Sequence, residues 1–416
     1  MQRRSDSWEQ KMSEKRNLEL YIHIPFCKRK CNYCDFVSFA GCEDRYDAYI
    51  DVLCEEIRRS AREFPDRNIV SVYIGGGTPS VLSCEQISRL VNTLKSEFSI
   101  HHVKEKRKGL FLQKKIRPAV EFSIEVNPGT VDKEKLHCYR KLGINRLSIG
   151  LQSTDDQDLK TLGRIHTYDD FAETLEQARE AGFCNINVDL MQAIPGQTLA
   201  AWKRVLAVTG TWKPEHISAY SLIVEDGTPF GKLQEEGKLL LPDEETEREI
   251  YYYTREFLEK SGYRRYEISN YAIPGFECIH NIGYWKRAEY LGLGLNASSM
   301  AGNIRWKNTA DLDHYLNYYG LTEGERNPVR EEVASLPRNE QMEEFIFLGL
   351  RLTEGISRRE FLDTFHQDFS LLYGDNLRRL TDLGLMEQED DRIRLTERGI
   401  DVSNKVISEL LIKNDD

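Results

Sequence analysis

Three cysteines stand close together in this chain, at Cys27, Cys31 and Cys34, within the run Cys-Lys-Arg-Lys-Cys-Asn-Tyr-Cys-Asp-Phe. Their spacing puts three thiols on one loop, directly after an apolar stretch at residues 18–24 that is typical of a strand. An iron–sulfur cube has four irons, so three thiolates leave the fourth iron open to a ligand from outside the protein. The pattern therefore predicts a [4Fe–4S] cluster with one open coordination position.

Zinc is the alternative that these residues leave open. A site of three cysteines and one histidine is common, and His23 precedes the loop by four residues. Zinc ligands more often come as two separated pairs than as one loop with three thiols. The next cysteine, Cys42, falls outside the spacing, and Asp35 and Phe36 follow the third thiol where another ligand would stand. The spacing favours the iron–sulfur interpretation.

Composition limits the class of protein. At 416 residues, the chain predicts one large domain with a smaller one. The net charge of −11 argues against a general nucleic-acid-binding protein. The sequence has no run of about 18 apolar residues, so we expect at most peripheral membrane contact. The polar residues 1–17 predict a disordered lead-in without a secretory signal, and nine cysteines in such a chain indicate reduced thiols in the cytoplasm.

Short β-branched runs alternate with longer amphipathic stretches from residue 18 to about 260, which is typical of repeated βα units and a parallel sheet. Six strands are expected, at residues 18–24, 69–74, 120–126, 146–151, 185–191 and 216–222. Helices are expected at 45–63, 86–98, 168–181, 199–209 and 243–260. These units predict an α/β fold, an incomplete (β/α)6 barrel over residues 18–262. Ligands of such sheets gather at the carboxyl ends of the strands.

The rest of the chain predicts two further parts. Residues 263–271 have strand character and open an extension over residues 263–337. Within residues 338–416, helical stretches at 341–350, 357–365 and 371–383 precede a short strand pair at 385–387 and 392–395 and a last helix. This order predicts a winged-helix-like α+β domain. Because the segment is not notably basic, a docking module or lid is favoured over DNA binding.

Several polar or small residues follow the expected strands. Gly76, Gly77 and Thr78 come after the second strand, where glycines let backbone groups approach a ligand. Glu125 and Gln152 stand at the ends of the third and fourth strands, Asp189 lies on the fifth strand, and the cation Arg164 stands in the run Gly-Arg-Ile-His at residues 163–166. A carboxylate at the barrel mouth is costly unless it meets a ligand or a cation, and an arginine there can also grip a carboxylate in a bidentate manner. We therefore expect these residues to form one site with the cysteine loop.

The run Tyr-Ile-His-Ile-Pro-Phe-Cys at residues 21–27, followed by C-x3-C-x2-C, resembles the radical S-adenosylmethionine superfamily, in its coproporphyrinogen III dehydrogenase-like branch. In that superfamily three cysteines hold a [4Fe–4S] cluster, S-adenosylmethionine chelates the open iron, and an electron from the cluster cleaves the sulfonium to a 5′-deoxyadenosyl radical. The resemblance implies Cys27, Cys31 and Cys34 as the cluster ligands. It also implies a nucleotide site at the matching positions Tyr21, Tyr33, Gly76, Gly77, Thr78, Glu125, Gln152, Arg164 and Asp189.

Within this branch, two features separate the chain from the dehydrogenase itself. The dehydrogenase has a further cysteine two residues after the third ligand, where this chain has Phe36, and only seventeen mostly polar residues precede the first expected strand, where the dehydrogenase has a longer arm. The run Cys-Asp-Phe and the segment His-Asn-Ile-Gly-Tyr-Trp at residues 280–285 are instead similar to the HemW family of heme chaperones. One departure from the branch is Ala193-Ile-Pro in place of the usual Gly-Leu-Pro, so we expect a different loop shape there.

This second resemblance implies a protein that binds heme, carries the cluster with S-adenosylmethionine, and passes heme to an acceptor such as a respiratory hemoprotein. His280 is the expected heme ligand, as a neutral imidazole beside Tyr284 and Trp285, although a histidine among aromatic residues is more often a packed core residue. The alternative is an enzyme, an oxygen-independent coproporphyrinogen III dehydrogenase that abstracts hydrogen from propionate side chains. The sequence leaves open whether Cys278 is a heme ligand and whether the chain forms a dimer. It also leaves open which protein donates the electron and whether the nucleotide is cleaved in turnover.

Overall fold

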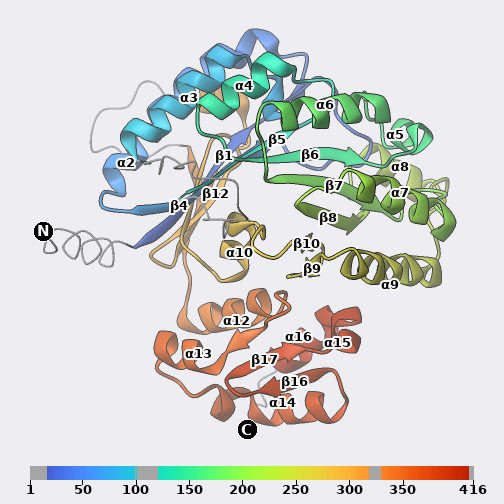
Figure 1. Ribbon diagram of the computed structural model, residues 1–416. Helices are drawn as coiled ribbons and strands as arrows, with labels where there is room; N and C mark the ends of the chain where they lie inside the picture. Colours follow the sequence, from blue (N-terminus) through green and yellow to red (C-terminus); the bar gives the residue numbers. More distant parts are fainter. Residues whose placement is uncertain (1–15, 99, 101–119, 318–328, 412–416) are drawn as a thin grey trace, which may run out of the picture.

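The computed structural model describes residues 16–98, 100, 120–317 and 329–411. The expected lead-in at residues 1–17 lies outside the described residues except for its last two. Figure 1 shows one large twisted sheet with helices packed along it, and a second lobe, coloured orange to red, below the sheet.

The centre of the sheet is parallel and follows the predicted order. Its strands are β1 (Asn17–Ile24), β4 (Asn68–Gly76), β5 (Glu121–Val126), β6 (Arg146–Gln152), β7 (Ile186–Gln192) and β8 (His216–Ser221). They lie side by side in chain order, each parallel to the next. All seven residues of β6 are buried, as expected for a strand covered on both faces. The prediction of an incomplete (β/α)6 barrel is confirmed, with a sheet that is open rather than closed.

The helices that follow these strands are α2 (Tyr46–Glu63), α3 (Cys84–Glu97), α4 (Lys133–Lys141), α5 (Asp156–Thr161), α6 (Tyr168–Glu180), α7 (Leu199–Thr211), α8 (Pro229–Glu235) and α9 (Glu244–Lys260). Of these, α3 to α9 begin at capping side chains, whereas α2 has none. Helix α3 begins two residues before its predicted start, because Ser83 and Gln86 form a reciprocal capping box. The turns η1 (Glu43–Arg45) and η2 (Pro79–Val81) precede α2 and α3.

Residues after the barrel extend both edges of the same sheet. On one side β11 (Tyr290–Leu293) pairs in parallel with β1, and β12 (Ser298–Ala301), β13 (Ile304–Asn308) and β14 (Arg330–Ser335) continue antiparallel. On the other side β10 (Asn270–Ala272) pairs with β8, and β9 (Arg264–Arg265) pairs with β10. The helices of this part are α10 (Ile279–Trp285) and α11 (Leu312–Leu316).

Residues 263–271, where the sequence indicates strand character, do not form one continuous strand. The segment is divided into the two short strands β9 and β10, which pair with each other. Between them Glu267 forms an isolated antiparallel bridge with Leu352, and the backbone N–H of Thr353 donates to the carbonyl of Tyr266 at 3.0 Å. Pairing with the second lobe therefore diverts the backbone from one continuous strand.

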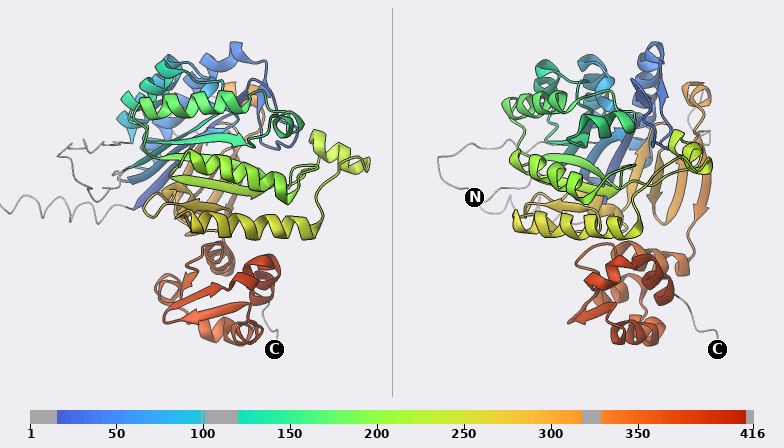
Figure 2. Two further views of the ribbon diagram at one scale, coloured as in Figure 1. Left: turned by 45° about the vertical axis from the view of Figure 1, so that its right-hand side comes forward. Right: turned by 90° about the vertical axis from the view of Figure 1, so that its right-hand side faces the viewer.

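The second lobe has the predicted order of helices followed by a wing. Its elements are α12 (Arg338–Gly349), β15 (Ile356–Ser357), α13 (Arg358–Phe365), α14 (Phe369–Asp382), β16 (Met386–Glu389), β17 (Arg392–Leu395), α15 (Glu397–Asp401) and α16 (Ser403–Leu411). A core of its own includes Phe361, Phe369 and Leu380. Figure 2 shows the lobe as a separate body under the sheet, and Glu344 joins the two by accepting from Arg287 at 3.0 Å and pairing with Arg305 at 2.7 Å.

No helix in the described part of the chain is long and apolar enough to cross a membrane.

A buried carboxylate ties the extension to the barrel. Glu56 on α2 is 2% exposed and accepts three hydrogen bonds, from the backbone N–H of Gly294 (2.9 Å), the side-chain amide of Asn308 (2.7 Å) and the hydroxyl of Tyr315 (2.6 Å). Burial raises the pKa of Glu56, although the three donors act against that rise. One side chain thus satisfies groups from three segments that lie far from it in the sequence.

Replacing Glu56 with alanine should lower the free energy of unfolding by at least about 3 kcal/mol, because each of three buried donors left without an acceptor costs about 1–3 kcal/mol. Glu56→Gln keeps the shape and one carbonyl acceptor and should lose less. Urea unfolding of both variants beside the parent chain measures the difference. A loss below about 1 kcal/mol in Glu56→Ala, within the usual range of one net hydrogen bond, would show that this contact does not hold the extension.

Candidate functional site

The cysteine loop is closed at its base by a small sheet. Its first thiol, Cys27, belongs to β2 (Phe26–Cys27), which pairs in parallel with β3 (Phe39–Ala40) after the loop. The backbone N–H of Phe39 donates to the carbonyl of Pro25 at 2.8 Å, and further out that of Asn32 donates to the carbonyl of Leu162 at 2.9 Å. Backbone hydrogen bonds therefore hold the loop against the carboxyl ends of β1 and β6.

The three thiols lie near one another and near hydrogen-bond donors. Cys27 is buried, and Cys31 and Cys34 are half-buried. The hydroxyl of Thr78 donates to Sγ of Cys27 at 3.4 Å, and the guanidinium of Arg164 donates to Sγ of Cys31 at 3.6 Å. Burial raises the pKa of Cys34, and the charges of the other two thiols raise it further. Donors to sulfur favour the thiolate, which is the form that binds iron.

The donor set fits an iron–sulfur cube in its chemistry. Among the described residues, no three histidine, cysteine or acidic side chains converge closely enough to hold one metal ion. Two thiolates on one zinc ion lie less than about 4.6 Å apart, since each Zn–S bond is about 2.3 Å. Thiolates on a cube bind different irons and therefore stand further apart. Three thiols on one loop, with donors beside two of them, are the type of ligand that an iron–sulfur cluster takes from a protein.

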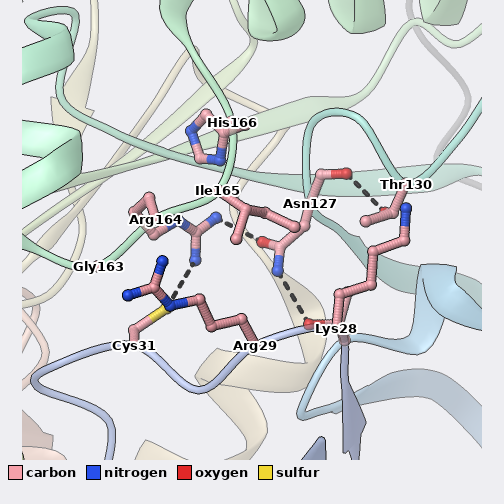
Figure 3. Close-up of a pocket in the computed structure, with 10 residues that line it drawn as sticks. Lys28, Arg29, Cys31, Asn127, Thr130, Gly163, Arg164, Ile165 and His166 are labelled. Carbon is pink, nitrogen blue, oxygen red and sulfur yellow. Dashed lines mark hydrogen bonds between the residues drawn. The ribbon is translucent and has the colours of Figure 1, made fainter. Parts of the chain in front are cut away.

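A chain of hydrogen bonds leads from the thiols into the strand ends. The guanidinium of Arg164 donates to Oδ1 of Asn127 at 2.6 Å and to the carbonyl of Gly150 at 2.8 Å. The side-chain amide of Asn127 then donates to Oγ1 of Thr78 at 2.9 Å. Figure 3 shows Arg164 between Cys31 and Asn127 at the wall of a pocket. The ends of β5 and β6 and the cysteine loop therefore meet at one cation.

This pocket brings together some of the predicted residues and several others. Of the predicted set, Cys31, Thr78 and Arg164 line it. The other lining residues are Lys28, Arg29, Asn127, Thr130, Gly163, Ile165 and His166. Of these, Asn127 had a sequence signal, because it follows Glu125 by two residues at the same strand end. The others lie on loops whose path only the fold determines.

The glycines after β4 are required by close packing. At Gly76, φ is 114°, and a Cβ there would lie 2.6 Å from the ring of His23. At Gly77, a Cβ would lie 2.7 Å from the carbonyl oxygen of Phe26 and 3.0 Å from Sγ of Cys27. Since real Cβ atoms do not approach so closely, only glycine lets this loop lie directly against the cysteine loop.

Glu125 is held by the same glycine loop. Its carboxylate accepts from the hydroxyl of Tyr73 at 3.0 Å and from the backbone N–H of Gly76 at 3.1 Å. Burial, together with the nearby charge of Asp189, raises the pKa of Glu125 to about 7. The carboxyl group is thus poised to accept or donate a hydrogen bond near neutral pH.

Gln152 and Asp189 lie further along the same edge, outside the pocket that Arg164 lines. Gln152 has a φ of 70° at a register shift in β6, and its side-chain oxygen accepts from the hydroxyl of Tyr220 at 3.1 Å. Asp189 accepts from Ser148 at 3.2 Å and from the side-chain amide of Asn187 at 2.7 Å, and burial raises its pKa. The left-handed backbone at Gln152 is a strained conformation of the kind that clusters at functional sites.

The two predicted tyrosines lie apart. The hydroxyl of Tyr21 is 3.0 Å from Nδ1 of His23, whose Nε2 is 3.0 Å from the carbonyl oxygen of Val37. Tyr33 packs against a small apolar cluster at the carboxyl edge, formed by Leu162, Met191, Ile194 and Phe230. Tyr21 therefore supports the base of the cysteine loop, and Tyr33 fixes its outer part.

The departure at Ala193 has a structural cost. Ala193 adopts a φ of 56°, in the left-handed region that glycine enters freely. For a residue with a Cβ this conformation costs about 1–2 kcal/mol. The backbone of the loop after β7 is thus in a conformation that glycine would adopt without this cost.

His280 lies beside β1 and β4, on the amino-terminal side of Tyr21 and Tyr73. Its ring is buried, with Nδ1 2.8 Å from the hydroxyl of Ser71 and Nε2 3.2 Å from that of Tyr284, and it stacks on Tyr73 at 5.2 Å between ring centroids. Burial lowers the pKa of His280 to about 3, so the ring is neutral at pH 7. The carboxylate of Glu19 lies 3.6 Å from Nδ1 of His280. Glu19 comes five residues before the end of β1, and five residues span roughly 17 Å along a strand. The fold does not bring His280 to the cysteine loop.

Comparison with known proteins gives two domain matches. A family model described as the Radical SAM superfamily matches residues 21–208, and one described as the HemN C-terminal domain matches residues 336–402. The first covers the strands and loops of the candidate site, and the second covers most of the lower lobe.

Curated relatives match over nearly the whole chain. A protein of Lactococcus lactis subsp. lactis named heme chaperone HemW is 36% identical over 392 residues, which is 94% of this chain and 97% of that protein. The heme chaperone HemW of Bacillus subtilis is 34% identical over 394 residues, 94% of this chain and 98% of that protein. Among solved structures, coproporphyrinogen III oxidase (HemN) from Escherichia coli has a TM-score of 0.78 at 24% identity, covering 97% of this chain and 93% of that chain. At that identity the likeness shows the fold alone.

Replacing Cys31 with alanine should abolish the four-iron cluster, because three thiolates leave no spare ligand on the loop. Iron and sulfide content after anaerobic reconstitution measures the effect. Cys42→Ala is the matched control: this half-buried thiol lies outside the motif, donating to the carbonyl of Ala40 at 3.7 Å, and its loss should leave the iron content unchanged. A full complement of four irons in Cys31→Ala would show that the ligand assignment is wrong.

Proposed function

The chain belongs to the HemW family of the radical SAM superfamily, and from this premise we propose that it is a heme chaperone that binds heme, carries a [4Fe–4S] cluster with S-adenosylmethionine, and passes heme to an acceptor hemoprotein. The observation that carries the proposal is the loop of three thiols, two of which accept hydrogen bonds from Thr78 and Arg164 at the carboxyl edge of the sheet. The relatives that match over nearly the full chain bear the heme chaperone name.

The residues proposed to hold the cofactors are those of the carboxyl edge. Cys27, Cys31 and Cys34 would bind three irons, and the nucleotide would contact the positions Tyr21, Tyr33, Gly76, Gly77, Thr78, Glu125, Gln152, Arg164 and Asp189. A bound cluster with S-adenosylmethionine supplies one-electron chemistry. The chain itself contributes donors to the sulfurs, the cation Arg164, and the carboxyl of Glu125, whose pKa near 7 lets it pair with an amino group.

His280 is the proposed heme ligand. Its low pKa keeps the imidazole neutral at pH 7, which is the form that ligates iron. Both ring nitrogens contact hydroxyl groups, so binding requires that the ring leave either Ser71 or Tyr284. Since Tyr284 lies on the same short helix as His280, α10, a shift of that helix would part Nδ1 from Ser71 on β4, whereas freeing Nε2 requires the Tyr284 side chain to turn away. The thiol of Cys278, which donates to Glu121 at 3.3 Å, is the alternative ligand on this segment.

The rival function is oxygen-independent coproporphyrinogen III dehydrogenase. Phe36 favours the chaperone: it stands where the dehydrogenase has a further cysteine, and its side chain is 67% exposed beside the loop. We therefore propose that the chain lacks dehydrogenase activity and acts in the cytoplasm on a heme-accepting partner, with an electron donor for the cluster. A dimer remains an open part of this proposal.

Anaerobic protein with a reconstituted cluster should bind heme and give no protoporphyrinogen from coproporphyrinogen III, reductant and S-adenosylmethionine. Heme titration followed by its Soret band measures the first property, and chromatography of the porphyrin products measures the second. Loss of heme from the protein to an apo-hemoprotein, followed by the acceptor's spectrum, tests transfer. Turnover of coproporphyrinogen III would contradict the proposed chaperone function and favour the dehydrogenase.

His280→Ala should weaken heme binding and shift the Soret band, because the proposed axial nitrogen is removed. His137→Ala is the matched control, since His137 is exposed on α4 and outside both sites. Tyr284→Phe should bind heme at least as well as the parent chain, because it frees Nε2 from its hydroxyl contact. An unchanged Soret band in folded His280→Ala would assign the ligand to another residue, and Cys278→Ala would then be compared.

A further inference from the structure

Two cysteines outside the cluster loop lie against each other. Cys84 is the first residue of α3 and Cys138 lies on α4, and Figure 1 shows these helices as neighbours on the same side of the sheet. The Sγ atom of Cys138 is 3.9 Å from the carbonyl oxygen of Cys84 and 3.8 Å from the hydroxyl of Ser88. Both thiols are half-buried, so a small reagent can reach them.

The thiols also interact directly. Burial raises the pKa of Cys84 to about 11, with a hydrogen bond to Cys138 and the charge of that thiol as the next causes. Since the thiolate is the nucleophile in thiol–disulfide exchange, the reaction at this pair should speed up as the pH rises toward that value. A disulfide needs the sulfurs to close to about 2.0 Å, so α3 and α4 must move slightly as the bond forms.

The pair is connected to the pocket through Lys135. Lys135 lies three residues before Cys138, on the same face of α4. Its ammonium donates to the carbonyl of Ser80 at 3.0 Å and to that of Thr130 at 3.1 Å. A movement of α4 therefore pulls on both loops at once, the one after β4 and the one after β5.

The loops after β4 and β5 form part of the pocket wall. The hydroxyls of Ser80 and Thr130 are 2.6 Å apart, and the backbone N–H of Asn127 donates to the Ser80 hydroxyl at 3.1 Å. Thr130 and Asn127 line the pocket in Figure 3, and Thr78, which donates to the thiol of Cys27, belongs to the same loop as Ser80. A strain at α4 thus reaches groups that contact the cysteine loop.

We propose that Cys84 and Cys138 are a redox modification site: they form a reversible disulfide with a small-molecule disulfide as oxidant, and this bond weakens nucleotide binding in the pocket. The thiolate of one cysteine attacks a sulfur of the oxidant and releases one thiolate. The second cysteine, as thiolate, then attacks the mixed disulfide and releases the other thiolate. Two protein thiols are oxidised to one disulfide and one small disulfide is reduced to two thiols; the two protons that the protein thiols lose are taken up by the two released thiolates. The effect on binding rests on the S-adenosylmethionine site proposed above, whereas the disulfide does not.

The disulfide is tested on the full chain, purified anaerobically with its cluster and treated with oxidised glutathione. After alkylation and digestion without reductant, mass spectrometry should find a cross-linked peptide pair that contains Cys84 and Cys138. Cys184→Ser is the matched control: that exposed thiol lies outside the pair, with its Sγ 3.8 Å from the carbonyl of Gly182, and the cross-link should persist. Glutathione or alkyl label on both Cys84 and Cys138, without a cross-link, would overturn the proposal.

The effect on the pocket is tested by equilibrium dialysis with labelled S-adenosylmethionine. Affinity should fall roughly two- to tenfold on oxidation, the range that one net hydrogen bond contributes, and return with dithiothreitol. Cys138→Ser treated in the same way should keep its affinity, which controls for damage to the cluster. Unchanged affinity of the cross-linked chain for S-adenosylmethionine would show that the disulfide does not affect nucleotide binding. Absence of binding by the reduced chain would instead count against the proposed nucleotide site, and the cross-link assay would still test the disulfide.

Discussion

A single half-buried cation joins the cysteine loop to the sheet. The guanidinium of Arg164 donates to a thiol on the loop, to the side chain of Asn127 at the end of β5, and to the carbonyl of Gly150 in β6. Its planar fork of donors can serve these three acceptors together, which a lysine ammonium on a flexible stem does less well. The position of the first and second thiols relative to the strand ends depends on this contact and on Thr78.

Two groups of titratable side chains lie on either side of Tyr73, which stacks on His280 at 5.2 Å between ring centroids and donates to Glu125 at 3.0 Å. At the carboxyl edge, burial and the neighbouring Asp189 raise the pKa of Glu125 to about 7. At the amino edge, burial and Glu121 raise the pKa of Glu19 to about 9, while burial lowers that of His280 to about 3. Loss of solvent is the first cause in each case, and it disfavours the charged form of acids and bases alike. The proposed nucleotide site and the proposed heme ligand therefore lie in two polar regions of one sheet that meet at the rings of Tyr21 and Tyr73.

The central strands and the helices between them could be predicted because their signals are local. Alternation of β-branched runs with amphipathic stretches gave the order of β1 and β4 to β8, and capping side chains such as Ser83 set where helices begin. The division of residues 263–271 into two short strands could not be predicted, because Glu267 between them forms a bridge with the second lobe. That partner lies far along the chain, and no local pattern reports it.

By itself, the sequence determined the chemistry available to this protein. It placed three thiols on one loop, glycines after the second strand and polar residues at successive strand ends, since residue type and spacing are properties of the chain. Only the tertiary structure decided which of these groups meet. Arg164 reaches Cys31, Gln152 and Asp189 do not line that pocket, and His280 packs on Tyr73, whose hydroxyl donates to Glu125. The physical reason is that contacts between distant segments depend on strand order and on the packing of loops, and neither is encoded in the neighbourhood of any one residue.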